Sequence, residues 1–413
     1  MCPIRTAFSY LCIQIMIDPI LYSTQFPLAV WLLLAATFLC ACIIASIVWT
    51  RLIRVRRRVL ADDRAELPEE GYPPVSVIVY AHADAANLRT FLPAILEQDY
   101  PADMEVIVVN DESRDDTETV VSELEMRYPN LYMTFAPEES RHLSRRKLAI
   151  TLGVKAARHN ALLLTEGRCA VPSPLWMRSM MRHMSEGKEV VIGYALTVTP
   201  DGEPDRTPRR RRRSYDRLWA TLRALSPAIG RHPFMADACN LAYTRRLFFE
   251  RKGFSRTLHL TYGDDDVFIR EIATPDSTAV ELSHRSRILI PGEYHNDIHD
   301  LERIRRDFTS RMLPRCHYIS SALVSFLWWA MIAAAAVASL LGWPSLIPLV
   351  ASAVFILAFA LTYGILWRRT ARALGERPIR FTAFFMALWR PARTLRYRLL
   401  ASRHRSRQYT HTA

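Results

Sequence analysis

Apolar residues follow two different patterns along this chain. Residues 19–50 and 319–367 contain no charged side chain, and most of their positions are hydrophobic. A helix needs about 20 consecutive apolar residues to cross the hydrocarbon core of a membrane. The second stretch is long enough for two helices, because a Gly-Trp-Pro sequence interrupts it. The pattern therefore predicts three membrane-spanning helices, at about residues 28–49, 320–341 and 345–366.

Between these stretches, short apolar runs alternate with helical patterns. The runs are rich in aliphatic residues and occur at 75–81, 105–109, 131–136, 161–165 and 190–194. Helical patterns fall between them at 85–98, 115–127 and 144–158. Alternation of this kind is typical of a mostly parallel sheet with helices on both faces. We therefore predict an α/β fold for the middle of the chain. Residues 200–232 contain proline and an arginine run, and we expect them to form a surface loop.

Arginines next to the predicted membrane helices indicate an orientation. Five lie between positions 51 and 58, directly after the first helix, and three lie between 368 and 372, after the last. Because cytoplasmic flanks carry the excess of Lys and Arg, the N-terminus would lie outside, and the middle domain and C-terminus inside. In a bacterium this would be an inner-membrane protein. The predicted segments are an N-terminal helix with its basic flank, a cytoplasmic domain, two membrane helices and a basic tail: 1–58, 59–318, 319–367 and 368–413.

The net charge of +13 is compatible with either nucleic acid or anionic lipid as a partner. The arginines cluster beside the membrane helices, in the tail and at 209–213, and no nucleic-acid-binding module is recognisable. Juxtamembrane basic clusters are attracted to anionic headgroups. Residues 379–400 combine a short apolar run with arginines, which predicts an amphipathic helix in the membrane interface. We therefore expect anionic membrane lipids, and no nucleic acid, as partners. The seven cysteines are scattered without metal-type pairing, which fits a reducing compartment.

Acidic residues follow two of the predicted strands. Asp84 comes shortly after the first, and Asp111 ends the run EVIVVND. In open parallel sheets, ligands bind beyond the carboxyl ends of the strands. The two carboxylates therefore indicate a polar ligand such as a nucleotide sugar. The simpler alternative is that Asp111 caps the next helix.

Five segments within residues 73–318 carry motifs: PPVSVIVYAHADAANL, VIVVNDESRDDT, RRKLAITLGVKAA, DACNLAYTRRLF and YGDDDVFIREI. In this order they resemble glycosyltransferase family 2, in its membrane-bound branch that includes cellulose and hyaluronan synthases. The resemblance implies a GT-A type, Rossmann-like domain that binds a nucleotide sugar. It places nucleoside-binding residues, a diphosphate-binding lysine and an acceptor-side asparagine at Asp84, Asp111, Lys147 and Asn240.

The resemblance places the catalytic base at Asp265, inside the triple Asp264 to Asp266. A positioned carboxylate can take the proton that the acceptor hydroxyl loses as it attacks. Crowded carboxylates raise the proton affinity of one member, which suits a base. We place the neighbouring Asp264 on the acceptor side. The alternative is that the triple is a helix N-cap, with Asp264 as the capping residue.

The sequence departs from the family pattern at two places. The acidic pair expected after the fourth strand reads Glu166-Gly167-Arg168. Glu166 can bind Mg²⁺ or Mn²⁺, whereas Arg168 would clamp phosphate directly, which puts a metal requirement in doubt. Of the QxxRW element of processive members, only Arg311 remains. It would contact the diphosphate or the acceptor, or it would be a basic flank at the membrane surface.

These observations predict a membrane-bound, inverting glycosyltransferase. It would move a sugar from a nucleotide donor, expected to be a UDP-sugar, to a lipid-linked or saccharide acceptor. The altered acidic pair motivates an alternative: a degenerate glycosyltransferase that binds nucleotide sugar or lipid and acts as a membrane scaffold or regulator. P-loop, dinucleotide-binding and serine-hydrolase motifs do not occur.

Overall fold

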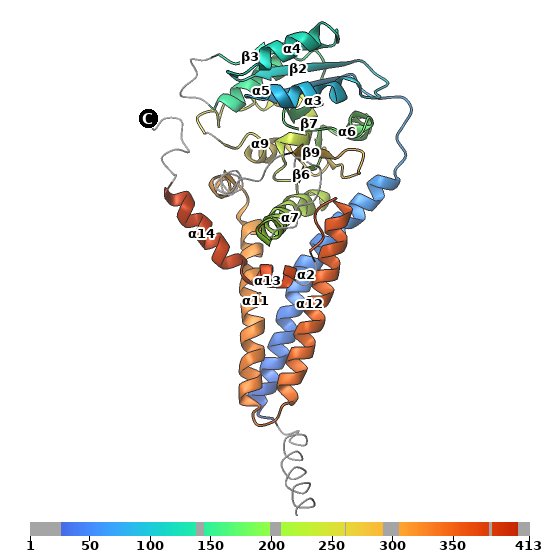
Figure 1. Ribbon diagram of the computed structural model, residues 1–413. Helices are drawn as coiled ribbons and strands as arrows, with labels where there is room; N and C mark the ends of the chain where they lie inside the picture. Colours follow the sequence, from blue (N-terminus) through green and yellow to red (C-terminus); the bar gives the residue numbers. More distant parts are fainter. Residues whose placement is uncertain are drawn as a thin grey trace, which may run out of the picture. The chain divides into compact units, whose positions relative to one another are not determined.

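The computed structural model describes residues 26–137, 144–198, 208–260, 262–291, 305–379 and 382–403 (Figure 1). The chain divides into two compact units. The first, called the α/β unit below, comprises Arg51–Arg315, Arg369–Pro378 and the residues from Thr394 onward. The second, called the helical unit, comprises the residues up to Thr50, Cys316–Arg368 and Ile379–Arg393.

The α/β unit contains the mostly parallel sheet that the sequence predicted. Within the described residues, its strands lie in the order β3-β2-β1-β4-β7-β5-β8. Strand β7 is antiparallel to both of its neighbours, and the other neighbouring pairs are parallel. The strands are β1 (Val75–Ala81), β2 (Met104–Asn110), β3 (Leu131–Phe135), β4 (Ala161–Glu166), β5 (Val190–Ile192), β7 (Leu241–Thr244) and β8 (Thr278–Val280). The run predicted at 190–194 continues into a separate strand, β6 (Ala195–Val198), which pairs with β9 (Ile288–Pro291).

Close packing of a helix against the sheet positions the first residues of that helix. Strands β1, β2 and β4 are buried at nearly every position and form the core. Helix α5 (Arg145–Ala156) lies so close to them that a Cβ atom at Gly153 would come within 2.7 Å of Ile78 and 2.9 Å of Val109. Only glycine permits this approach. The other helices that flank the strands are α3 (Ala85–Leu96), α4 (Thr117–Glu125), α6 (Trp176–Ser185), α8 (Arg245–Glu250) and α9 (Asp266–Ile272).

The predicted surface loop at 200–232 is wrong for residues 208–229. These residues form helix α7 (Pro208–Ile229). Its apolar side chains recur at helical spacing and are buried at Tyr215, Leu218, Trp219, Leu222 and Leu225. Burial of this stripe stabilises a helix even though its first turn is arginine-rich. The period was present in YDRLWATLRAL, but the preceding proline and arginine run obscured it.

Among the described residues, three helices are long and apolar enough to cross a membrane, and they correspond to the three predicted spans. They are α2 (Leu28–Arg64), α11 (Arg315–Leu341) and α12 (Ile347–Ala373). Helix α2 continues well past the predicted end at residue 49. Within the helical unit, aromatic rings pack together: Trp49 stacks on Phe359 with ring centroids 5.7 Å apart, and Trp328 lies 5.4 Å from the same ring.

The segment predicted as one amphipathic helix at 379–400 contains two helices. They are α13 (Thr382–Leu388) and α14 (Arg390–Arg403). Leu395 and Leu399 are exposed on α14, and so are Arg396 and Arg398. A location in the membrane interface stays a prediction.

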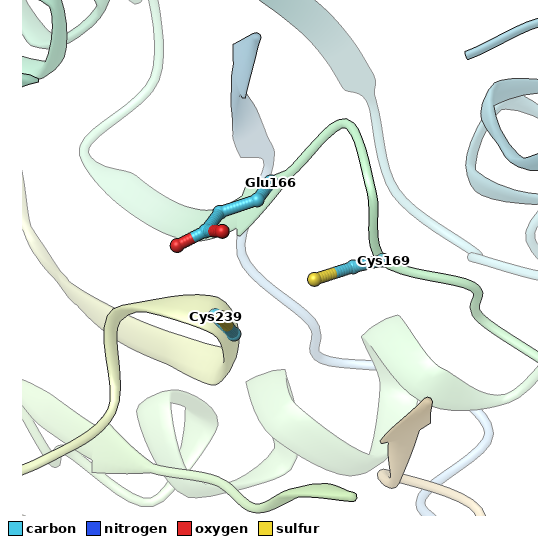
Figure 2. Close-up of side chains that lie close together, drawn as sticks. All are labelled: Glu166, Cys169 and Cys239. Atoms are coloured by element: carbon cyan, nitrogen blue, oxygen red, sulfur yellow. The ribbon is translucent and has the colours of Figure 1, made fainter. Parts of the chain in front are cut away.

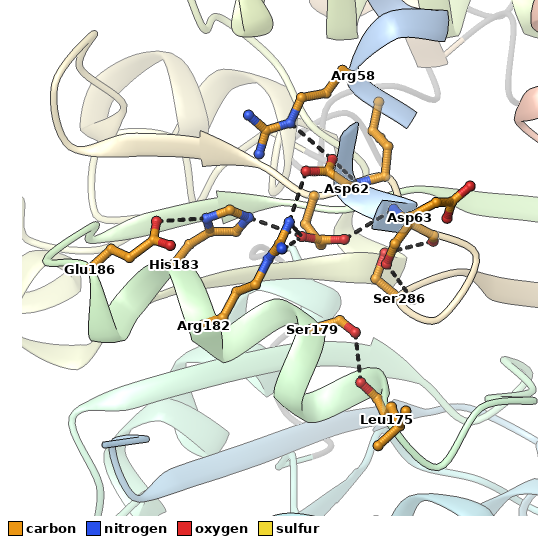
Figure 3. A network of polar contacts seen from close by, with 12 residues as sticks. Arg58, Asp62, Asp63, Leu175, Ser179, Arg182, His183, Glu186 and Ser286 are labelled. Atoms are coloured by element: carbon orange, nitrogen blue, oxygen red, sulfur yellow. Dashed lines mark hydrogen bonds and ion pairs between the residues drawn. The ribbon is translucent and has the colours of Figure 1, made fainter. Parts of the chain in front are cut away.

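A buried ionic network binds the last turns of α2, which belong to the α/β unit, to the rest of that unit (Figure 3). Arg182 donates to Asp62 of α2 at 2.8 Å and pairs with Glu281 at 2.5 Å. The Nε2 atom of His183 lies 3.0 Å from the same Glu281 carboxylate. Burial opposes ionisation of Glu281, but the hydrogen bond with His183 and the charge of Arg182 outweigh it and lower its pKa to about 2. Asp62 also accepts from the backbone nitrogen of Leu282 at 3.0 Å.

Replacement of Arg182 by alanine should destabilise the protein strongly. Asp62 and Glu281 are almost fully buried, and the substitution would leave both without their shared cation. Breaking a buried ion pair costs about 3–5 kcal/mol. Urea unfolding of the detergent-solubilised protein measures this loss. The matched control is Arg127→Ala, which removes an exposed arginine paired with Glu97 and should change stability by less than about 1 kcal/mol. Equal stability of the two variants would contradict a structural role for the network.

Candidate active site

The ends of three neighbouring strands bring polar side chains to one edge of the sheet. In the β1–β4 ladder, Tyr80 lies opposite Glu166, the last residue of β4. Directly after β2, the backbone nitrogen of Asp111 donates to the carbonyl of Ala81 at 2.9 Å. Asp84 follows β1 and occupies the residue before α3. The parallel register therefore places the predicted donor-side residues around the end of β1.

Asp111 is buried and has two side-chain partners. Its Oδ2 accepts from the Tyr80 hydroxyl at 2.7 Å, and its Oδ1 accepts from Arg145 Nε at 2.9 Å. The residue before helix α4 is Asp116, so Asp111 does not cap that helix and the simpler alternative is wrong. Asp84 accepts from the backbone nitrogen of His82 at 3.2 Å, and burial raises the pKa of its carboxyl.

Two guanidinium groups bind Glu166, one at each carboxylate oxygen. Arg146 Nη2 donates to Oε1 at 2.5 Å, and Arg168 Nε donates to Oε2 at 2.6 Å. Burial of Glu166 opposes its ionisation, but the charges of Arg146 and Arg168 outweigh burial and hold its pKa far below the ordinary range. Glu166 is therefore an anion in a buried position, as a cation-binding carboxylate must be.

The triple aspartate lies at the start of α9, and two of its members contact Arg305. Arg305 Nη2 donates to Asp264 at 2.8 Å and to Asp265 at 3.0 Å. Asp265 is the N-cap of α9, and its Oδ1 accepts from the backbone nitrogen of Asp266 at 2.8 Å. The capping alternative is therefore correct in part, with Asp265 rather than Asp264 as the cap.

The three aspartates differ in proton affinity. Burial favours the protonated form of each, but the charges of Arg305 and Arg146 hold the pKa of Asp264 at about 2. Burial and the neighbouring Asp265 raise the pKa of Asp266 to about 7. The pKa of Asp265 is raised by burial, and Arg305 opposes this shift. The cluster thus holds one fixed anion beside groups that bind a proton more readily.

A cavity of about 150 Å³ opens beside these groups. Glu166, Arg168 and Asp265 line it, together with Asp237 and Arg305. Small and apolar side chains, several of them from α7, supply much of the remaining lining: Ala220, Ala224, Leu225, Met235 and Ile290. Asp84 and Asp111 are not part of this lining. Asp111 is connected to it through Tyr80, whose hydroxyl donates to Asp111 and whose ring lies under the guanidinium of Arg146 at 4.8 Å.

Comparisons with known proteins identify the family. Residues 76–249 match the model described as glycosyl transferase family 2. The chain therefore contains a glycosyltransferase family 2 domain. A curated relative, the glycosyltransferase AglE of Haloferax volcanii, is 27% identical over 132 residues, which is 32% of this chain. The match spans 42% of the length of that relative.

Two solved structures resemble this chain to different degrees. The mannosyltransferase PcManGT from Pyrobaculum calidifontis, in complex with GDP-Man and Mn²⁺, aligns with a TM-score of 0.50 and 17% identity, over 87% of this chain and 99% of that one. GalNAc-T7 with UDP, GalNAc and Mn²⁺ aligns with a TM-score of 0.40 and 14% identity, over 55% of this chain and 45% of that one. The likeness to PcManGT shows that the sheet is of the GT-A type.

Lys147 of the glycosyltransferase domain has partners other than the predicted diphosphate. Its side chain is fully buried, and Nζ donates to the carbonyls of Thr257 at 2.6 Å, Leu260 at 3.0 Å and Tyr262 at 2.8 Å. An ammonium group has three protons, so these bonds use all of them. Burial lowers the pKa of Lys147 to about 8. In this structure Lys147 holds the loop that leads to the triple aspartate.

Asn240 and Arg311 also differ in their surroundings from what the sequence predicted. Asn240 is buried, donates to the carbonyls of Tyr194 at 3.0 Å and Ser286 at 2.8 Å, and accepts from Trp176 Nε1 at 3.1 Å. It therefore fixes the backbone around the cavity. Arg311 is exposed and is not part of the cavity lining, an arrangement that favours the basic-flank alternative.

Glu166, Cys169 and Cys239 form a compact group, with possible ligand atoms within 4.8 Å of one another (Figure 2). A hydrogen bond with Cys169 and burial raise the pKa of the Cys239 thiol well above its ordinary value. Metal binding requires the thiolate form. The structure therefore favours Glu166, rather than the Cys239 thiol, as the ligand for a cation.

Sequence reasoning missed the arginines that hold the site together. Arg145 and Arg146 belong to the RRK start of α5, where the family resemblance assigned a role to Lys147. Arg305 lies about 40 residues beyond its aspartate partners, so no local signal pointed to it. Tyr80 looked like an ordinary strand residue. The two consecutive arginines at a helix N-terminus were the one available signal, because positive charge is unfavourable there.

Lys147→Met should lower stability without removing nucleotide binding. The substitution would leave three carbonyl groups without their donor, at a cost of about 1–3 kcal/mol for each buried group left unsatisfied. Affinity for UDP or GDP should fall by less than about threefold, because the ammonium does not face the cavity. Thermal unfolding and calorimetric titration measure the two effects.

The matched control for that experiment is Lys155→Met, on the exposed side of the same helix. It should change stability by less than about 0.5 kcal/mol. A tenfold or greater loss of nucleotide affinity in Lys147→Met, with stability unchanged, would instead support direct contact with the diphosphate.

Proposed function

We propose that this protein is a membrane-bound, inverting glycosyltransferase that moves a sugar from a nucleoside diphosphate donor to a lipid-linked or saccharide acceptor. The observation that carries the proposal is the cavity where Asp265 lies with Glu166 and Arg168. A carboxylate, a cation-binding anion and a phosphate-binding cation are the groups that such a transfer needs.

Asp265 is the proposed base. Its side chain is 15% exposed and lines the cavity. Each of its oxygens accepts one hydrogen bond, from Asp266 N and from Arg305, and each retains a further lone pair. The acceptor hydroxyl would give its proton to this carboxylate while its oxygen bonds to the anomeric carbon. The bond from that carbon to the diphosphate breaks on the opposite face, so the configuration inverts.

Arg168 is proposed to stabilise the departing diphosphate. Its guanidinium lines the cavity and is held by Glu166, which fixes its direction. A planar guanidinium can bind two phosphate oxygens at once. Asp111 and Asp84, at the ends of β2 and β1, are proposed to bind the nucleoside, and UDP-sugars are the first donors to test. PcManGT holds GDP-Man, which supports a nucleoside diphosphate sugar as the donor class and makes GDP-sugars the second set.

Glu166 fits a divalent metal ion. Arg146 binds Glu166 and Asp264 at once, at 2.5 and 2.6 Å, so a positive charge already lies against both carboxylates. Glu166 would hold Mg²⁺ or Mn²⁺, with phosphate oxygens of the donor as further ligands. When bound, the ion would offset the charge of the leaving diphosphate. The Mn²⁺ in PcManGT supports this cofactor class.

The surroundings of the cavity support the remaining parts of the proposal. Apolar side chains such as Leu225 and Met235 in its lining suit an acceptor with a lipid portion. The arginines in the C-terminal parts of α2 and α12 support a cytoplasmic catalytic domain, with the N-terminus outside and the C-terminus inside. The exposed leucines and arginines of α14 suit a surface of anionic lipids.

Asp265→Asn should abolish sugar transfer and leave donor binding nearly intact. The amide keeps the size of the side chain but cannot take the proton, so we expect a fall in kcat of at least about 100-fold. Product formation from UDP- and GDP-sugars in a membrane-lipid mixture measures transfer, and calorimetry measures donor binding. The matched control, Asp276→Asn, alters an exposed aspartate and should keep full activity. Substantial turnover by Asp265→Asn would rule out the assigned base. No donor binding or turnover by the wild type would favour the scaffold alternative.

Chelation should reduce transfer by at least about tenfold, because removal of the ion would leave the charge of the diphosphate less well balanced. The assay compares EDTA-treated protein with the same protein after addition of Mg²⁺ or Mn²⁺. Recovery of activity on addition is the expected result. Full activity in EDTA would show that the guanidinium groups alone balance the charge of the leaving diphosphate, and it would reject a metal cofactor.

A further inference from the structure

Arg146 lies beside the cavity lining and bridges the groups of the candidate site. Its Nε donates to Asp264 at 2.6 Å and its Nη2 to Glu166 at 2.5 Å. The guanidinium lies 4.8 Å above the centre of the Tyr80 ring, and the side chain is 18% exposed. One residue thus contacts the end of β4, the triple aspartate and the aromatic ring on β1. Neither the sequence motifs nor the family resemblance singled it out.

The contacts of Tyr80 extend this connection to the nucleoside side of the site. Its hydroxyl donates to Asp111 at 2.7 Å, while its ring supports the guanidinium of Arg146. A cation over the face of an aromatic ring is stabilised by the ring. The ring also restricts how the planar guanidinium can be oriented. Arg146 therefore lies between the carboxylate proposed to bind the nucleoside and the carboxylates beside the proposed base. A donor that reached from the one to the other would bring its diphosphate close to Arg146.

The other cationic side chains nearby are less suited to binding the diphosphate of the donor. The ammonium of Lys147 is used by three backbone carbonyls, and Arg145 is held by Asp111 and Glu112. Arg305 pairs with both Asp264 and Asp265. Arg146 differs because its Nη2 partner is Glu166, which a metal ion can take over.

We propose that Arg146 binds the diphosphate of the donor and positions it between the nucleoside site and the base. Its Nε keeps Asp264, which fixes the side chain, while its Nη atoms turn from Glu166 to phosphate oxygens. Glu166 is then free for the metal ion or is held by Arg168 alone. This inference rests on the proposed function and names the residue that recognises the leaving group. It also explains the aromatic ring at position 80, because Tyr80 supports the guanidinium in both states.

The test separates recognition of phosphate from recognition of the nucleoside. Purified wild type, Arg146→Ala and Arg146→Lys are titrated calorimetrically with UDP and uridine, and with GDP and guanosine, in EDTA and again with Mn²⁺. For the base that binds the wild type, Arg146→Ala should weaken the nucleoside diphosphate by at least about tenfold in both conditions. Affinity for the nucleoside should change by less than about twofold. The control Arg89→Ala removes an exposed arginine paired with Glu123 and should change neither value.

Two results would overturn the assignment of Arg146. One is a nucleoside diphosphate affinity in Arg146→Ala equal to that of the wild type. The other is an equal loss for nucleoside and nucleoside diphosphate, which is the signature of a merely structural role. If Arg146→Ala does not fold, Arg146→Lys decides. Lysine keeps the charge but loses the planar fork, so the diphosphate should weaken by at least about threefold with the nucleoside unchanged, and equal affinities would overturn the proposal. Failure of the wild type to bind UDP or GDP would instead overturn the proposed function itself.

Discussion

The pairing of buried carboxylates with guanidinium groups is the constraint on which the candidate site depends. Asp111, Glu166 and Asp264 are each nearly inaccessible to solvent, and each contacts at least one arginine. A buried carboxylate without a partner costs several kcal/mol, so the anions can occupy these positions only if the cations do as well. The carboxyl edge of the sheet is therefore a balanced ionic cluster, in which the place of each carboxylate depends on an arginine from another element.

This balance of positive and negative charge determines which ligands the site can bind. A nucleoside diphosphate brings negative charge, and the arginines can exchange a carboxylate for a phosphate without loss of pairing. A divalent ion brings positive charge and can take over the carboxylate that an arginine releases. Donor and metal ion would thus enter together more easily than either alone, because the exchange leaves no buried charge unpaired. Asp265 stands at the edge of the cluster, partly exposed to the cavity, where an acceptor hydroxyl can reach it.

Much of the fold, and part of the candidate site, could be predicted from local patterns in the sequence. Buried strands such as Val75–Ala81 read as continuous aliphatic runs, and uncharged stretches of sufficient length predicted the three helices that are long and apolar enough to cross a membrane. The positions of Asp111 and Asp265 followed from their motifs. Helix α7 was missed because its buried stripe begins after an arginine run that reads as a loop. The partners of Lys147 and Asn240 are backbone carbonyls from distant segments, and no local feature of the sequence encodes such contacts.

A structure of the purified protein with a bound nucleoside diphosphate tests the central claim most directly. We predict that the base contacts Asp111 or Asp84 and that the phosphates lie against Arg168 and Arg146. The terminal phosphate should face the cavity that Asp265 lines. A nucleotide bound elsewhere, with the arginine–carboxylate pairs of the cluster undisturbed, would show that these side chains serve stability alone and would contradict the enzymatic account.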